Sequence, residues 1–190
     1  MKLTKEKIEE LKKQLTSNLE KFRKEFCSEN ESTPIDIFKI LDRMGFDVYY
    51  ANLGKYDGAI LVDERTAVIE GFNSNRLMVV NAKLPYENSV FTLAHELAHY
   101  LTQKWINPNT NLQIEFREHS TKGRRNETEN FMDYIAASIL MPKEWFAKSL
   151  ANKEIYTKND EVSVDIIESL AKQYGVEFEA AKRRIQEVLS

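Results

Sequence analysis

Two of the three histidines in this chain of 190 residues lie four positions apart, in the segment HELAH at residues 95–99. Apolar residues recur around this segment at helical spacing, from Val90 to Leu101, and predict a helix that packs against a core. The helix is expected to begin near Ser89, with Asn88 or Ser89 as its N-cap. Because a helix turns about 100° per residue, the two histidines share one face of it. Any fold of this chain must therefore bring a pair of imidazole rings to one place.

The segment HELAH matches the pattern H-E-x-x-H, in which two imidazoles one turn apart can bind one Zn²⁺ at about 2.0–2.1 Å each. Glu96 is rotated by about a quarter turn from His95, so its carboxylate can reach a water beside the ion without being a ligand. Zinc lowers the pKa of such a water to about 7, and a neighbouring carboxylate can accept its proton. The pattern therefore predicts metal-assisted hydrolysis, usually of a peptide bond. The alternative is a solvent-exposed helix face whose histidines have no function, although protonated rings this close repel each other.

A catalytic zinc site needs a third protein ligand and keeps one position open. The candidates downstream are His119, in a polar segment, and the acidic residues Glu127 and Glu129. Asp133 follows Glu129 by four residues on the same predicted helix face, where it can hydrogen-bond a ligand histidine. Glu129 also fits a capping box with Asn126 as the N-cap. Spacing alone therefore leaves the third ligand open between these three candidates.

The pattern of apolar residues along the rest of the chain predicts an α+β fold. Residues 8–26 carry apolar side chains at spacings of three and four, which predict a long N-terminal helix. The segments DVYYA, GAILV, TAVIE and RLMVVN are short and β-rich, so three or four antiparallel strands are expected within residues 48–81. LQIEF, at residues 112–116, is a further candidate strand. A helix that begins near Asn126, and two or three more after Pro142, complete the prediction.

The length of the chain suits one domain with helical additions at its ends. We expect an N-terminal helix at residues 1–30, a domain that carries the histidines at residues 31–150, and a helical segment at residues 151–190. The last segment is expected to pack on or beside the core.

The composition argues against several classes of protein. The net charge of −3 gives no reason to expect direct nucleic-acid binding. No apolar run approaches the roughly 20 residues that a membrane span needs, and the N-terminus lacks the apolar centre of a secretory signal. A single cysteine excludes an internal disulfide. Together these features predict a cytoplasmic protein.

Two blocks of the sequence, FTLAHELAHY at residues 91–100 and ETENFMDYIAASILMP at residues 127–142, resemble the ImmA/IrrE-type metallopeptidases. The resemblance covers residues 33–146. It implies a compact zincin-like fold, in which a small sheet packs beside two active-site helices. The family has a Glu as third metal ligand at a fixed distance before the proline of the second block. In this chain the position is Glu129, thirteen residues before Pro142.

The resemblance also implies the roles of individual residues. The metal site would be formed by His95, His99 and Glu129. Glu96 would be the general base, and Asp133 would hydrogen-bond a ligand histidine. Zn²⁺ is the expected ion, and Mn²⁺ also tolerates this set of ligands.

Relatives of this type are cytoplasmic bacterial or phage proteins. Several of them cleave a helix-turn-helix repressor and so release genes for stress response or mobile-element transfer. The resemblance therefore implies a zinc-dependent endopeptidase whose protein substrate is a transcriptional repressor. The alternative is a non-catalytic binding or sensing module on the same fold, which regulates a repressor by binding it. Glu96 weighs against this alternative, because a pure binding protein has no use for a base at this position.

Overall fold

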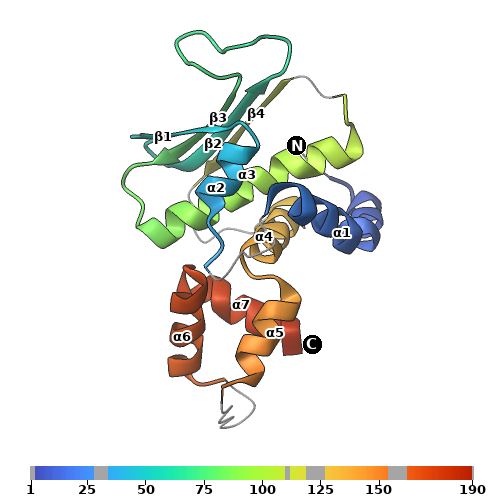
Figure 1. Cartoon of the computed structure of the whole chain (residues 1–190), viewed down its shortest axis with the longest axis vertical. Helices are drawn as coiled ribbons and strands as arrows, with labels where there is room; N and C mark the ends of the chain where they lie inside the picture. The colour runs from blue at the N-terminus through green and yellow to red at the C-terminus, as the bar shows by residue number, and fades with distance from the viewer. Residues whose placement is uncertain (1–2, 28–33, 110–111, 119–126, 154–161, 190) are drawn as a thin grey trace.

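The computed structural model describes residues 3–27, 34–109, 112–118, 127–153 and 162–189. These residues form seven helices and four strands (Figure 1). The helices are α1 (Lys5–Phe26), α2 (Ile37–Arg43), α3 (Tyr86–Ile106), α4 (Glu127–Leu140), α5 (Lys143–Ala151), α6 (Val164–Tyr174) and α7 (Phe178–Leu189). The strands are β1 (Asp47–Ala51), β2 (Tyr56–Asp63), β3 (Arg76–Asn81) and β4 (Leu112–Glu118). The predicted α+β class, with a small sheet and helices at both ends of the chain, is confirmed.

The four strands form one sheet in the order β1-β3-β2-β4. Strand β2 pairs antiparallel with both β3 and β4, whereas β1 pairs parallel with β3. The sheet is therefore mixed, and its β1–β3 pair departs from the antiparallel sheet that the sequence predicts. The reason is the path of the chain. A short connection at residues 52–55 reverses the direction between β1 and β2, and β3 then inserts between them antiparallel to β2, which makes it parallel to β1.

The segment TAVIE, at residues 66–70, is a loop in the structure and not the strand that its composition suggests. Val68 is 49% exposed, and the Ile69 amide donates a hydrogen bond to the Ser74 carbonyl at 2.9 Å, within the same loop. A turn precedes it, in which the Asp63 carboxylate accepts hydrogen bonds from the backbone and the guanidinium of Arg65. The other candidate, LQIEF, does lie in a strand, because it belongs to β4 and pairs with β2.

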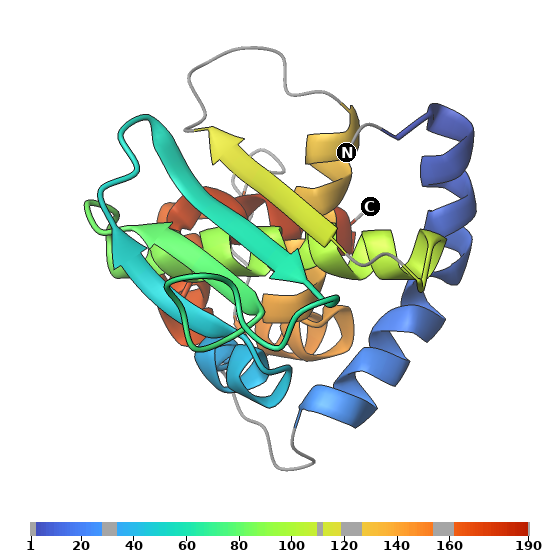
Figure 2. The same cartoon turned by 90° about the horizontal axis from the view of Figure 1, so that it is seen from above.

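Helix α3 lies at the centre of the molecule. The sheet lies across one side of it, as the view from above shows (Figure 2), and α4 packs against the other side. Every residue from Ser89 to Thr102 is buried. The helix begins at Tyr86, earlier than the sequence predicts, because Pro85 precedes it and its carbonyl accepts a hydrogen bond from the Ser89 amide at 2.9 Å. Proline suits this position, since the first helical turn leaves its amide groups without helical partners.

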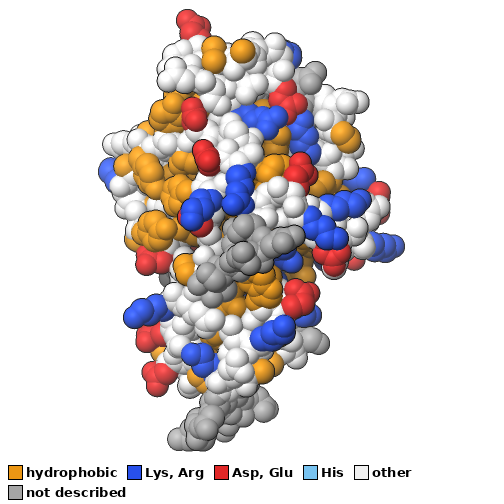
Figure 3. All heavy atoms as spheres, in the orientation of Figure 1, with side chains coloured by type: hydrophobic (Ala, Val, Ile, Leu, Met, Phe, Trp, Pro, Cys, Tyr) orange, Lys and Arg blue, Asp and Glu red, His pale blue; other side chains and the backbone are white. Residues whose placement is uncertain are grey.

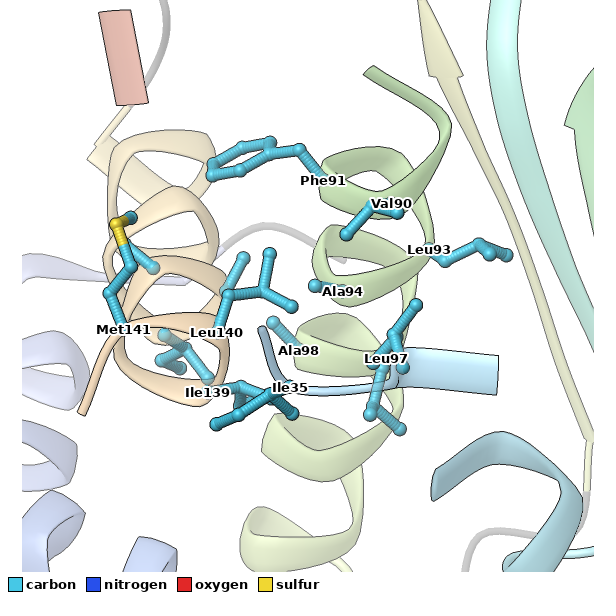
Figure 4. Close-up of a cluster of buried hydrophobic side chains, with 14 of the residues drawn as sticks. Ile35, Val90, Phe91, Leu93, Ala94, Leu97, Ala98, Ile139, Leu140 and Met141 are labelled. Carbon is cyan, nitrogen blue, oxygen red and sulfur yellow. The ribbon is translucent and has the colours of Figure 1, made fainter. Parts of the chain in front are cut away.

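Small side chains allow α3 and α4 to approach each other closely. Figure 4 shows Ala94 and Ala98 of α3 directed toward Ile139 and Leu140 of α4, and all four side chains are buried. Close packing of this kind fixes the distance and the rotation between the two helices. Polar side chains that project from both helices are therefore held in a defined geometry.

The terminal helices are attached to α4 and its C-terminal end. The Leu3 amide, just before α1, donates a hydrogen bond to the Thr128 hydroxyl at 2.8 Å, and Arg23 donates to the Ser138 carbonyl at 2.7 Å. In α7, Arg184 is 2% exposed and its Nε donates to the Met141 carbonyl at 2.9 Å. Buried apolar side chains of all seven helices form one core. The boundaries at residues 1–30, 31–150 and 151–190 remain a prediction.

The surface shows no dominant charge on the face drawn in Figure 3, where Lys and Arg side chains alternate with Asp and Glu side chains. That the protein does not bind nucleic acid remains a prediction. In the parts of the chain that the structure describes, no helix has both the length and the apolar character needed to cross a bilayer.

Candidate metal centre

The packing of α3 against α4 brings three of the predicted site residues together. His95 and His99 project from α3 and Glu129 from the first turn of α4. The Nε2 atoms of the two histidines are 3.1 Å apart. The Glu129 Oε2 atom lies 3.1 Å from Nε2 of His95 and 3.6 Å from Nε2 of His99. These three atoms form a compact triangle of potential metal ligands.

The dimensions of this triangle fit a metal ion. Ligand atoms at about 2.0–2.1 Å from a tetrahedral Zn²⁺ lie roughly 3.3–3.4 Å from one another. The observed separations of 3.1, 3.1 and 3.6 Å are close to that value. Two imidazoles and one carboxylate are also one of the ligand sets that catalytic zinc sites use.

Asp133 holds the ring of His95 in place. Its Oδ1 lies 2.8 Å from Nδ1 of His95, and both residues are buried. An ionised carboxylate only accepts hydrogen bonds, so the proton of the neutral ring lies on Nδ1, and the lone pair of Nε2 is directed into the triangle. That lone pair would then face the Glu129 oxygen, and two acceptors would oppose each other at 3.1 Å. A cation between them removes this conflict.

In the absence of a metal, hydrogen bonds can join Glu129 to the two histidines. Hydrogen bonds from His95, and then from His99, hold the pKa of Glu129 well below its usual range, against the opposing effect of burial. Glu129 is therefore a carboxylate at neutral pH, which is the form that binds a cation.

Glu96 follows His95 directly on α3 and is 1% exposed. It lies beside Gly58 of β2, where an added Cβ atom would be 3.6 Å from Glu96 Cγ and only 2.5 Å from Thr92 Cγ2. The backbone of β2 thus approaches α3 more closely than a side chain would permit. Gly58 is needed here for space, and the contact helps to hold the segment of α3 that carries Glu96.

Replacing Gly58 with alanine is expected to destabilise the protein by about 1–3 kcal/mol, because the new methyl group overlaps Thr92 Cγ2. Urea unfolding measures the change. The Thr92→Ser substitution removes that methyl group and keeps the hydroxyl, so the double variant should recover part of the loss in a double-mutant cycle. Strictly additive effects of the two substitutions would show that the overlap is not the cause.

The rival third ligands do not join the triangle among the residues that the structure describes. Glu127 is directed toward α1, where its Oε1 lies 3.0 Å from Nζ of Lys5, and its side chain is 54% exposed. His119, and the proposed N-cap Asn126, lie outside the described residues. Of the candidates that can be placed, Glu129 is the one beside both histidines.

No sequence pattern predicts one neighbour of this site. Arg183 of α7 donates from its NH1 group to Oδ2 of Asp133 at 3.4 Å, across 50 positions of sequence. No spacing rule connects two residues so far apart, and Arg183 stands among other basic residues of an amphipathic helix.

A helix with an H-E-x-x-H segment, packed between a small sheet and a second helix that carries a Glu, defines a zincin-like α+β fold. The model of the peptidase M78 family, described as the IrrE N-terminal-like domain, matches residues 41–186. The chain belongs to this family, which confirms the resemblance to ImmA/IrrE-type metallopeptidases. The match also extends past the region of resemblance, residues 33–146, and through most of α7.

Because the chain belongs to a peptidase family, its substrate is a protein. The same membership supports protease activity in general. Together with the cluster of His95, His99 and Glu129, it indicates a divalent metal. A search of curated proteins returned no match to this sequence.

Proposed function

We propose that this protein is a zinc-dependent endopeptidase in which His95, His99 and Glu129 hold the ion. The observation that carries the proposal is the triangle of two Nε2 atoms and one carboxylate oxygen, with sides of 3.1–3.6 Å. Zn²⁺ suits two imidazoles and a carboxylate, and Mn²⁺ is the second choice. When bound, the ion would supply Lewis acidity, which polarises the scissile carbonyl and lowers the pKa of the attacking water.

The protein residues supply the proton transfers and the alignment. Glu96 accepts the proton of the attacking water and later returns it to the departing amine, which is the work of a general base and then a general acid. Its burial strengthens every electrostatic interaction that it makes. Asp133 holds the His95 ring through Nδ1 and so keeps Nε2 aimed at the ion.

The proposed substrate is a regulatory protein, a helix-turn-helix transcriptional repressor of a phage, a mobile element or a stress response. This part of the proposal rests on the resemblance to ImmA/IrrE-type proteins. Because such repressors act on cytoplasmic DNA, the proposed reaction takes place in the cytoplasm.

Co-expression with the repressor encoded nearest the gene tests this function. Mass spectrometry should find two repressor fragments with the wild-type protein and an intact repressor with the Glu96→Gln variant. If the repressor stays intact with metal-loaded wild type, that repressor is not the substrate. If Glu96→Gln still relieves repression in cells, the protein acts by binding and not by cleavage.

A further inference from the structure

The Asp133 carboxylate is shared between two partners that come from different helices. Its Oδ1 lies 2.8 Å from His95 Nδ1, and its Oδ2 accepts a hydrogen bond from Arg183 NH1 at 3.4 Å. The chain of contacts therefore runs from α7 through α4 to α3. His99 differs from His95, because its buried Nδ1 has no hydrogen-bond partner among the described residues. His95 is thus the ligand candidate whose ring orientation depends on this chain of contacts.

Arg183 projects from a helix that is firmly fixed. The next residue, Arg184, is buried and hydrogen-bonds the Met141 carbonyl at 2.9 Å, while its NH1 group lies 2.7 Å from Glu187 Oε2. Ala181 on the same helix is fully buried. The backbone at Arg183 is therefore held in place, and the guanidinium, on a side chain that is 45% exposed, has only its own torsions to adjust.

The negative charge of Asp133 also calls for a cation at this position. The Asp133 carboxylate is buried, and its Oδ1 faces Nδ1 of His95. Arg183 supplies a positive charge on the side of Asp133 that faces away from His95. Charges in a buried cluster are tolerated when they are balanced and hydrogen-bonded.

We propose that Arg183 is a positioning residue for the metal centre. It holds Oδ2 of Asp133 so that Oδ1 stays on Nδ1 of His95, which keeps Nε2 of that ring directed at the ion. This inference rests on the proposed function, since it assumes that His95 is a metal ligand. By this inference, α7 contributes to the metal centre through Arg183.

The test compares Arg183→Met with Lys182→Met, which removes the same charge from an exposed neighbour on the same helix. Competition with a chromophoric chelator measures the Zn²⁺ dissociation constant of each protein, and thermal unfolding of the metal-free proteins measures their stability. Arg183→Met is expected to weaken zinc binding by about tenfold, at the low end for residues that orient a ligand. Lys182→Met should bind zinc like wild type, and Arg183→Lys should restore part of the affinity.

Equal zinc affinity in Arg183→Met and wild type would overturn the inference, as would equal losses in Arg183→Met and Lys182→Met. A lower melting temperature of metal-free Arg183→Met with unchanged zinc affinity would assign Arg183 a purely structural role. Wild-type protein that binds no zinc would overturn both this inference and the proposed function. Zinc binding by wild type without repressor cleavage would count against the proposed function alone.

Discussion

The Glu96→Gln protein is expected to cleave its substrate at least about a hundredfold more slowly than wild type, with an unchanged metal content. A glutamine amide has the shape of the carboxylate but cannot accept a proton from water at neutral pH. Glu96 is 1% exposed, so little bulk water can replace it as a base. Single-turnover cleavage, with zinc measured by atomic absorption on the same samples, gives both quantities.

The matched control for this variant is Glu87→Gln, which makes the same chemical change at an exposed position in the first turn of α3. It should retain wild-type cleavage. If Glu96→Gln cleaved as fast as this control while holding its metal, Glu96 would not be the general base.

Glu129→Gln is expected to weaken zinc binding on the order of a thousandfold, which exceeds the effect of residues that only orient a ligand. The substitution removes one ligand and one negative charge, and the two histidines alone form an incomplete site. Cleavage should fall with the metal content and recover only at high zinc concentration. Dialysis against buffered zinc followed by metal analysis measures the affinity.

Glu127→Gln provides the control, because Glu127 begins the same helix and its carboxylate is directed toward Lys5. An exposed ion pair of this kind contributes little, so this variant should bind zinc within about twofold of wild type. Equal zinc affinities of the Glu127 and Glu129 variants would remove Glu129 from the set of ligands.

The sequence predicts most reliably the features of the site that depend on the geometry of one helix. That His95 and His99 share one face follows from helical geometry alone, and in the structure their Nε2 atoms lie 3.1 Å apart. The position of Glu129 depends on how α4 packs against α3, which no local pattern contains. The resemblance selected Glu129 over its rivals, and its place beside the histidines agrees with that choice. Its role as a ligand stays a prediction.

Strand pairing and close backbone contacts were beyond what the pattern could predict. The residues of β1 are strand-like, but its parallel pairing with β3 follows from the later path of the chain. TAVIE has strand composition but lies in a loop, where Val68 is 49% exposed. Gly58 and Arg183 act across the fold, so their importance depends on neighbours that are distant in sequence.

The burial of α3 on all sides, from Ser89 to Thr102, limits how this protein can evolve. A replacement on such a helix meets a neighbour in every direction, so a change of side-chain volume there is expected to destabilise the protein. We therefore expect new substrate preferences to arise through changes in the segments around α3 and not on the helix that carries the histidines.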